Sequence, residues 1–287
     1  MTLTKRDQPE PAQRKGGPPM RVITVAMPKG GVGKSALAAE LVAALAAGGR
    51  RVLGVDLDQQ GNLTARLGLT GAAEVAGTTA DVLAGEMGLA GAAAPSPAID
   101  GADVLAGTHA LAGVEAAPPD DITTALRDML AAPGAGPWDA VVIDTPPAIG
   151  PLALAGLAAA TTIVAPVTPT VEAFDQLDRL EAVLAARLRR RINPRARIDF
   201  VVPSMVDPRT IADPTRGRLL DRDVLDQLRR LHGERVTAPI REAVAVRDAY
   251  LEALPTSLYA PDAAVAGDYR AATTTIITAT EQDGARP

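Results

Sequence analysis

The chain has no cysteine and very few aromatic residues. Its 287 residues include 2 Phe, 1 Trp and 3 Tyr, while 47% of them are hydrophobic. Without thiols there is no disulfide, no thiolate-held metal or iron–sulfur cluster, and no cysteine nucleophile. With so few aromatic faces, recognition of nucleic acid by base stacking is disfavoured. The apolar content excludes a disordered chain and is enough to build a large core.

Long hydrophobic runs are also missing. Residues 1–20 are polar and rich in proline and glycine, without the apolar core of a signal peptide, so we expect a flexible tail there. The least charged stretch, 152–167, is short for a membrane span and contains glycine, threonine and proline. The sequence therefore predicts no membrane segment, a cytoplasmic location, and one folded domain over residues 21–287.

Lysine is scarce, and charge is unevenly distributed along the chain. There are 4 Lys against 25 Arg, and the 29 basic and 34 acidic residues give a formal net charge of −5. Residues 179–247 contain 16 Arg, no Lys and 9 acidic residues, so this segment carries +7 and the rest of the chain −12. An acidic protein thus contains one basic region, which can bind a polyanion.

Strand and helix patterns alternate along most of the chain. Strands are predicted from apolar stretches at 21–27, 51–57, 102–105, 140–143, 162–166, 198–202 and near 236. Helices are predicted over 35–47, 78–83, 122–130, 152–159, 171–190, 218–231 and 262–275. We therefore expect an α/β fold, with a mostly parallel, doubly wound sheet and helices on both faces.

The sharpest motif lies between the first predicted strand and the first predicted helix. Residues 28–35 read PKGGVGKS, and the last three match the end of a P-loop. In a P-loop, backbone N–H groups and the helix N-terminus bind phosphate oxygens, the lysine reaches the β- and γ-phosphates, and the hydroxyl ligates Mg²⁺. Pro28 stands where the first glycine of the common pattern belongs, and a second lysine follows it. Because two of the four lysines fall in this loop, a chance match is disfavoured.

The segment Lys29-Gly-Gly-Val-Gly-Lys34-Ser35 resembles the deviant Walker A box of the ParA/MinD ATPases, a family of P-loop proteins. The resemblance implies that Lys34 binds phosphates within its own subunit. It also implies that Lys29 reaches across a nucleotide-sandwich homodimer to the ATP held by the partner, so both lysines are expected to serve catalysis. The loop residues expected to bind ATP are Lys29, Gly30, Gly31, Val32, Gly33, Lys34, Ser35 and Ala36.

Two later segments support the resemblance. The first, residues 56–62, reads DLDQQGN and is similar to the family's D-x-D-P-Q-G-N segment, with Gln59 in place of the proline. Carboxylates at positions i and i+2 after a strand point to the same side, where they can serve Mg²⁺ and an attacking water. By match to the family, Asp58 is expected to position the water and Asp56 to support the Mg²⁺ shell.

The second segment, residues 140–147, reads AVVIDTPP and is an apolar strand that ends in Asp144. This is the Walker B arrangement, in which the carboxylate holds Mg²⁺, usually through water. The family's D-x-P-P ending is complete, and the resemblance implies that residues 145–147 sense the γ-phosphate. The expected metal ligands are therefore Ser35, Asp56 and Asp144.

Other parts of the chain separate the relatives that share this loop. Iron proteins need cysteine ligands, and membrane attachment of the MinD type needs a basic amphipathic C-terminal helix, whereas residues 269–287 are rich in Thr and Ala. Residues 200–210, FVVPSMVDPRT, resemble a ParA segment that lies near the adenine and the dimer interface. Pro203, Met205 and Asp207 are therefore candidate base contacts. A strand exit followed by a type I turn explains the same segment equally well.

The basic region suits contacts with the DNA backbone. Arginine binds phosphates without regard to sequence, and the shortage of aromatic residues favours such contacts over base reading. The resemblance to ParA implies nonspecific binding of double-stranded DNA by the ATP-bound dimer, and an arginine-rich solvated helix end is the alternative. The candidate DNA contacts are Arg189, Arg190, Arg191, Arg209, Arg216 and Arg218, of which Arg209 could instead touch the partner subunit.

The sequence leads to one main hypothesis and two alternatives. The main one is a ParA-like ATPase that uses ATP and Mg²⁺, dimerises, binds nucleoid DNA and partitions a plasmid or chromosome with a ParB-like activator that stimulates its slow hydrolysis. The first alternative is a small-molecule ligase of the dethiobiotin-synthetase type that uses the same ATP site. The second is an ATPase that positions a non-DNA cargo by the same mechanism. The sequence does not identify the cargo or the activator.

Overall fold

A seven-stranded sheet runs through the computed structural model, which describes residues 20–70, 75–213 and 215–283. The parallel strands are β1 (Arg21–Val25), β2 (Val52–Asp56), β4 (Ala102–Leu105), β5 (Ala140–Asp144), β6 (Thr162–Val167) and β7 (Ile198–Pro203). The two-residue strand β3 (Ala94–Pro95) pairs antiparallel with β4, and the strand order is β3-β4-β2-β5-β1-β6-β7. The mostly parallel sheet is thus confirmed, whereas the tail predicted over 1–20 lies outside the described residues except for Met20.

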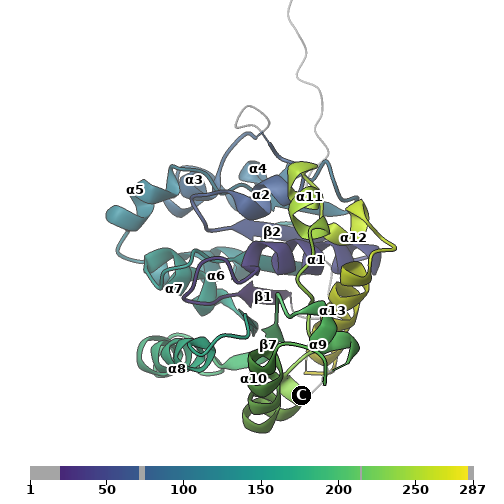
Figure 1. Cartoon of the computed structure of the whole chain (residues 1–287). Helices are drawn as coiled ribbons and strands as arrows, with labels where there is room; N and C mark the ends of the chain where they lie inside the picture. Colours follow the sequence, from purple (N-terminus) through teal and green to yellow (C-terminus); the bar gives the residue numbers. More distant parts are fainter. Residues whose placement is uncertain (1–19, 71–74, 214, 284–287) are drawn as a thin grey trace, which may run out of the picture.

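Helices cover both faces of this sheet (Figure 1). The longer ones are α1 (Lys34–Ala47), α6 (Ile122–Ala131), α7 (Pro151–Ala159), α8 (Ala173–Val183), α10 (Leu219–His232) and α13 (Ala264–Asp283). The shorter ones are α2 (Asn62–Arg66), α3 (Thr79–Leu83), α4 (Leu89–Ala92), α5 (Leu111–Ala116), the π-helical η2 (Leu184–Arg189), α9 (Pro208–Ala212), η3 (Gly233–Arg235), α11 (Ala245–Leu251) and α12 (Thr256–Tyr259).

The central strands pack on both sides because successive residues of a strand point to opposite faces. Ile23 and Val25 of β1 and Val142 of β5 lie in one hydrophobic cluster with α1 and α13. Val22 and Val141, which alternate with them, lie in a second cluster with α6 and α7. Full burial of each such side chain contributes about 1.5–3 kcal/mol, so the apolar strands fix the two helical layers.

Several elements differ from the sequence predictions at their ends. The helix predicted over 171–190 begins at Ala173 and continues as the π-helical turn η2 after Val183. The strand predicted near Val236 is only an isolated bridge with Val201. The strand near Val236 does not extend because its residues lack a continuous neighbouring strand to pair with, and the local apolar pattern does not supply one.

Three motifs meet at the carboxyl edge of the sheet. β5 lies between β1 and β2, and the registers pair Asp144 with both Val25 and Asp56. The glycine-rich turn follows β1, and the D-x-D segment starts at the end of β2. The fold therefore gathers these segments at the edge where parallel α/β sheets bind their ligands.

Candidate functional site

The turn between β1 and α1 leaves the start of a helix open. Gly31 and Gly33 have φ angles of 73° and 87°, which residues other than glycine rarely adopt. Gly33 is the N-cap of α1, and the helix begins at Lys34 without a side-chain cap. The first N–H groups of α1 consequently have no intrahelical partner and form an anion-binding position at the positive end of the helix dipole.

A serine from the neighbouring strand end braces this turn. The hydroxyl oxygen of Ser204 lies 2.7 Å from the carbonyl oxygen of Val32 and 3.2 Å from that of Val167. Ser204 and Val32 are both buried. The conformation of the turn is therefore held from β6 and β7 as well as by its own glycines, a contact that the sequence analysis missed.

The two lysines of the turn point in different directions. Lys34 is 7% exposed, and its Nζ donates to the carbonyl oxygen of Lys29 at 2.8 Å. Burial lowers the pKa of Lys34, while Asp144 acts in the opposite direction. The Nζ of Lys29 lies instead 3.4 Å from the hydroxyl of Thr170 and 4.0 Å from the carboxylate of Glu172. Lys34 thus faces the site, whereas Lys29 lies against a segment of its own chain after β6.

Asp56 is fully buried and holds a loop. Its carboxylate accepts hydrogen bonds from the N–H of Asp58 at 3.0 Å and from the N–H and hydroxyl of Thr64, both at 2.8 Å. Burial raises the pKa of Asp56 to about 6, against the effect of the bonds from Thr64. The expected role of Asp56 in the Mg²⁺ shell is therefore supplemented by a structural one, because it fixes the segment that carries Asp58.

Asp58 is the carboxylate of this loop that reaches the cavity. It is 7% exposed and lines the same space as Lys34 and Ser35. Its Oδ1 accepts a hydrogen bond from the N–H of Gln60 at 3.0 Å, which restrains the side chain. The arrangement allows Asp58 to act on a water near bound phosphate.

The surroundings of the Asp144 carboxylate show whether these residues fit a magnesium ion. Both of its carboxylate oxygens are buried and have no hydrogen-bond partner. Burial and the nearby Asp56 raise the pKa of Asp144 well above its usual range, and Ser35 and Lys34 offset this in part. A buried carboxylate without a partner is costly unless a cation meets it. Carboxylate and hydroxyl oxygens are ligands that Mg²⁺ accepts together with phosphate and water, so Asp144 and Ser35 fit such an ion.

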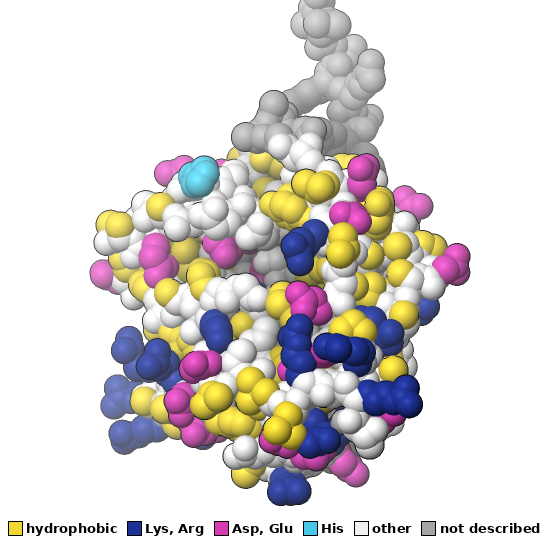
Figure 2. Space-filling view, in the orientation of Figure 1, with side chains coloured by type: hydrophobic (Ala, Val, Ile, Leu, Met, Phe, Trp, Pro, Cys, Tyr) yellow, Lys and Arg dark blue, Asp and Glu magenta, His cyan; other side chains and the backbone are white. Residues whose placement is uncertain are grey.

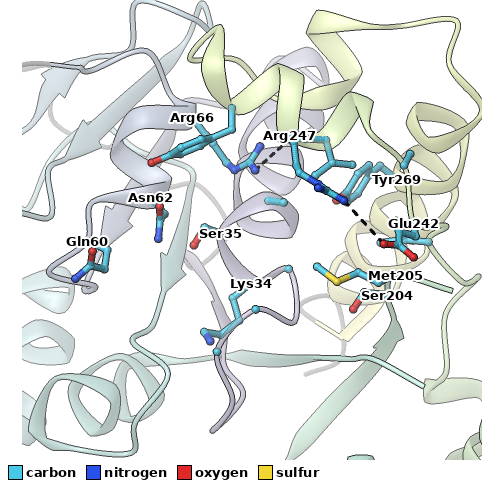
Figure 3. A pocket seen from close by; sticks show the side chains of 18 of the residues that line it. Lys34, Ser35, Gln60, Asn62, Arg66, Ser204, Met205, Glu242, Arg247 and Tyr269 are labelled. Atoms are coloured by element: carbon cyan, nitrogen blue, oxygen red, sulfur yellow. Dashed lines mark hydrogen bonds and ion pairs between the residues drawn. The ribbon is translucent and has the colours of Figure 1, made fainter. Parts of the chain in front are cut away.

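A cavity of about 730 Å³ opens in front of these residues (Figure 3). Its inner end is formed by the glycine-rich turn, and its outer wall by residues 240–251 and Met205. The volume is within the range of small-molecule sites. The lining residues that the sequence analysis missed are Gln60, Asn62, Arg66, Ser204, Ile240, Arg241, Glu242, Ala243, Val246, Arg247, Tyr250, Leu251 and Tyr269.

Of the three candidate base contacts, Met205 alone lines the cavity. Its φ of 56° is unusual for a residue with a side chain, and such strain concentrates at functional sites. Pro203 ends β7. The carboxylate of Asp207 caps α9 by accepting from the N–H of Arg209 at 2.9 Å, and it also pairs with the Arg209 and Arg218 side chains. The cap and the ion pairs therefore engage the Asp207 side chain, and the strand exit leads into the short helix α9.

Comparison with known proteins relates this geometry to a family. Residues 20–198 match the family described as AAA domain. The chain is 34% identical over 245 residues to the chromosome partitioning protein ParA of Caulobacter vibrioides, which covers 84% of this chain and 88% of the relative. It is 37% identical over 217 residues to the chromosome-partitioning ATPase Soj of Thermus thermophilus, with coverages of 76% and 79%. The chain belongs to the ParA/MinD family of ATPases.

Solved structures share the fold of this chain. A cobyrinic acid a,c-diamide synthase from Mycobacterium smegmatis, with bound ADP and magnesium, is 31% identical with a TM-score of 0.66, covering 81% of this chain and 91% of that one. Apo McdA of Cyanothece has a TM-score of 0.76 at 18% identity, covering 90% and 99%, which shows the shared fold. The presence of nucleotide and magnesium in the first relative is consistent with the P-loop, Ser35 and Asp144 of this ParA/MinD-family chain.

The arginines expected to contact DNA divide into two groups in this ParA/MinD-family protein. Four pair with acidic side chains: Arg189 with Glu181, Arg209 and Arg218 with Asp207, and Arg216 with Asp213. Arg190 and Arg191, which follow η2, have no acidic partner within the described ranges. None of the helices in those ranges has the length and hydrophobicity that a membrane span requires.

Proposed function

We propose that this ParA/MinD-family protein hydrolyses ATP with Mg²⁺ and uses the cycle to partition DNA. The observation that carries the proposal is the buried, unpaired carboxylate of Asp144 beside Ser35 and Lys34. A buried carboxylate in that state is stabilised when a cation that also binds phosphate lies against it. The curated relatives named as chromosome-partitioning proteins support the choice of DNA as the cargo.

The chain supplies a group for each requirement of phosphoryl transfer. The N–H groups at the start of α1 and the ammonium of Lys34 bind the phosphates and offset the charge that develops on them. Ser35 and Asp144 would hold Mg²⁺, which when bound would stabilise the negative charge of the phosphates. Asp58 orients the attacking water, and Asp56 keeps Asp58 in place through the loop it organises.

Dimerisation on ATP is proposed because Lys29 is only loosely held in its own subunit. Its contacts are a long hydrogen bond to Thr170 and a 4.0 Å ion pair with Glu172, whose side chain is 64% exposed. Surface ion pairs of this kind contribute about 0–1 kcal/mol. Lys29 can therefore leave this segment at little cost and reach the ATP of a second subunit in a nucleotide-sandwich dimer.

Nonspecific DNA binding is proposed at the arginine-rich end of α8 and η2. Figure 2 shows Lys and Arg side chains gathered over α8 at the lower left of the molecule. Arg190 and Arg191 lie in this basic region, and their charges are not neutralised by a described acidic neighbour. DNA phosphates would supply the missing negative charge in any sequence. We place the protein on the nucleoid and expect a ParB-like activator to stimulate its hydrolysis.

An electrophoretic mobility shift with arbitrary duplex DNA tests this function. The wild type should retard DNA with ATP and Mg²⁺ but not with ADP, and retardation should weaken steeply with salt. The double variant Arg190→Ala/Arg191→Ala should lower affinity and reduce the slope of log affinity against log salt by about 2 for each subunit that contacts the DNA. Arg270→Ala is the matched control, because Arg270 is exposed on α13 and lies outside the basic region of residues 179–247. DNA binding that ignores the nucleotide would contradict the switch.

A small-molecule ligase is the second candidate, because a separate cavity of about 370 Å³ lies beside the P-loop. It is lined by Pro28, by Pro147 of the switch segment, and by Arg179 and Arg187, whose guanidinium groups suit a carboxylate substrate. The solved relative named cobyrinic acid a,c-diamide synthase points to small-molecule chemistry in that protein. ATP turnover that is accelerated by small carboxylic acids and is indifferent to DNA would favour the ligase.

A further inference from the structure

A buried arginine lies in the wall of the cavity, outside every motif of the phosphate site. Arg66 is the last residue of α2 and is only 9% exposed. It lines the cavity together with Val246 and Tyr250 of α11. Burial lowers the pKa of Arg66, although arginine keeps its charge in proteins. The chain therefore keeps a cation inside the protein at this position.

Only part of this guanidinium is satisfied by the protein. One terminal nitrogen, Nη2, donates to the carbonyl oxygen of Val246 at 3.3 Å, and the guanidinium carbon lies 5.1 Å from the ring centre of Tyr250. The other, Nη1, is buried without any hydrogen-bond partner. In the described part of the chain no carboxylate lies within salt-bridge distance of Arg66. A buried donor left unpaired is destabilising, and more so when it is charged.

Glu40, the acid that most favours the charge of Arg66, does not supply the missing acceptor. Glu40 of α1 is 2% exposed, and its Oε1 accepts from the N–H of Ser257 at 3.0 Å, at the start of α12. The guanidinium lies over the face of the Tyr250 ring, which is the position that a cation prefers on an aromatic side chain. Arg66 is thus held in one orientation by α11 while one of its terminal nitrogens still lacks a partner.

The position of Arg66 indicates which part of a ligand would meet it. Phosphates belong at the inner end of the cavity, where Lys34 and Ser35 lie at the start of α1. Arg66 lies with the wall formed by α11, away from Ser204 and Met205 on the opposite side (Figure 3). That wall contains the apolar side chains Val246 and Leu251 and the ring of Tyr250. An apolar wall with few polar groups is the setting in which a base and a ribose are recognised.

We propose that Arg66 is a specificity-determining residue that donates a hydrogen bond from its unpartnered Nη1 to the nucleoside half of the bound nucleotide. The acceptor is a ring nitrogen of the purine or a ribose hydroxyl. This inference rests on the proposed ATPase function, because it takes ATP as the ligand of the cavity. Since Arg66 ends the segment that begins with Asp56, the same contact also ties the nucleoside to the loop that carries Asp58.

Calorimetric titration with ATP and with inorganic tripolyphosphate, both with Mg²⁺, tests the proposal. Arg66→Ala should weaken ATP binding by about tenfold or more, the size of a lost hydrogen bond from a charged donor. Tripolyphosphate binding should be unchanged, because it lacks the nucleoside. Arg270→Ala is the control, since Arg270 is exposed on α13 and donates to the Pro261 carbonyl oxygen. Equal losses for both ligands, or unchanged ATP binding, would overturn the proposal.

A second set of ligands separates direct contact from a purely structural role through α11. ATP analogues that each lack one acceptor (N1, N3, N7, the 2′-hydroxyl or the 3′-hydroxyl) are titrated against the wild type and Arg66→Ala. For one analogue the two proteins should bind equally, because the acceptor of Arg66 is already gone. A constant penalty across all analogues means that Arg66 only supports the fold of the wall, which overturns the proposal.

A substitute variant covers a failure to fold, and two outcomes distinguish failure of the Arg66 assignment from failure of the proposed ATPase function. If Arg66→Ala does not fold, Arg66→Lys replaces it, because lysine keeps the charge but loses the planar donor pair, and the same analogue comparison applies. If the wild type binds neither ATP nor tripolyphosphate, the proposed ATPase function fails. If the wild type binds ATP and the variants bind it equally well, only the assignment of Arg66 fails.

Discussion

Gly107 packs against Asp56 and the backbone of Asp58, and its replacement by alanine tests whether this close packing positions Asp58. A Cβ at residue 107 would stand 2.7 Å from the carboxylate carbon of Asp56, 2.7 Å from the carbonyl oxygen of Asp58 and 2.9 Å from Oδ1 of Asp56. These distances are too short for carbon contacts. The N–H of Gly107 also donates to the hydroxyl of Thr64 at 2.9 Å, which in turn donates to Asp56. Gly107→Ala must therefore displace the loop that positions Asp58.

The expected cost follows from these contacts. Overpacking of a tight site costs about 1–3 kcal/mol, and loss of the Gly107 to Thr64 hydrogen bond adds about 1 kcal/mol. The lower entropy of the unfolded alanine chain returns about 0.4–1 kcal/mol. We expect Gly107→Ala to lower the free energy of unfolding by about 1–3.6 kcal/mol. We expect it to lower the ATP turnover by about 10²-fold, because small misplacements of a catalytic group have effects of that size.

Urea denaturation and phosphate release measure the two effects, with Gly113→Ala as the control. Gly113 lies within α5, and a Cβ there would meet nothing within 4 Å. Alanine at residue 113 should therefore be neutral or stabilise the helix by up to about 1 kcal/mol, with unchanged turnover. If Gly107→Ala is as stable and as active as the wild type, the assignment of Asp56 as the residue that positions Asp58 is wrong.

Three further variants test separate parts of the account. Lys29→Ala should abolish the ATP-dependent dimer in analytical ultracentrifugation while ATP still binds; a dimer of normal stability would contradict the trans role of Lys29. The pKa of Asp207 is lowered to about 2, mainly by its hydrogen bonds with Arg209. The ionised carboxylate therefore stabilises the fold above pH ~4, and this contribution to stability is lost as the pH falls toward 2. In urea titrations the stability gap between the wild type and Asp207→Asn should therefore narrow from pH 5 to pH 2, and a constant gap would refute the ion pair as its source. Ser204→Ala should weaken tripolyphosphate binding, because the carbonyl of Val32 loses its donor; unchanged binding would show that the turn needs no brace.

The sequence predicted the parts of the site that short motifs encode. The glycine-rich turn, the D-x-D segment and the strand ending in Asp144 each combine a local pattern with a fixed chemical role, and the parallel sheet brings them to one edge. The fold class followed from the alternation of strands and helices for the same reason. The capped helix α3 was also predictable, because Thr78 and Asp81 form a capping box that is visible in the sequence.

The outer wall of the cavity was not predictable from the sequence. Residues 240–251 reach the site only because the chain returns over α1 after β7, and the segment pairs with Val206 through isolated backbone contacts. Arg66 has no motif either, since its role depends on Tyr250 and Val246, which are about 180 residues further along the chain. The role of Asp207 as a base contact stays a prediction, and its ion pairs with Arg209 and Arg218 were not predictable, because they depend on the folded chain.

The most direct test of the central claim compares ATP binding and ATP turnover in Asp58→Ala. Asp58 lines the cavity beside Lys34, while the phosphate-binding groups of α1 do not depend on its side chain. The account predicts that the variant binds ATP with Mg²⁺ as tightly as the wild type in calorimetry and releases no phosphate above background. Turnover at the wild-type rate would contradict the account.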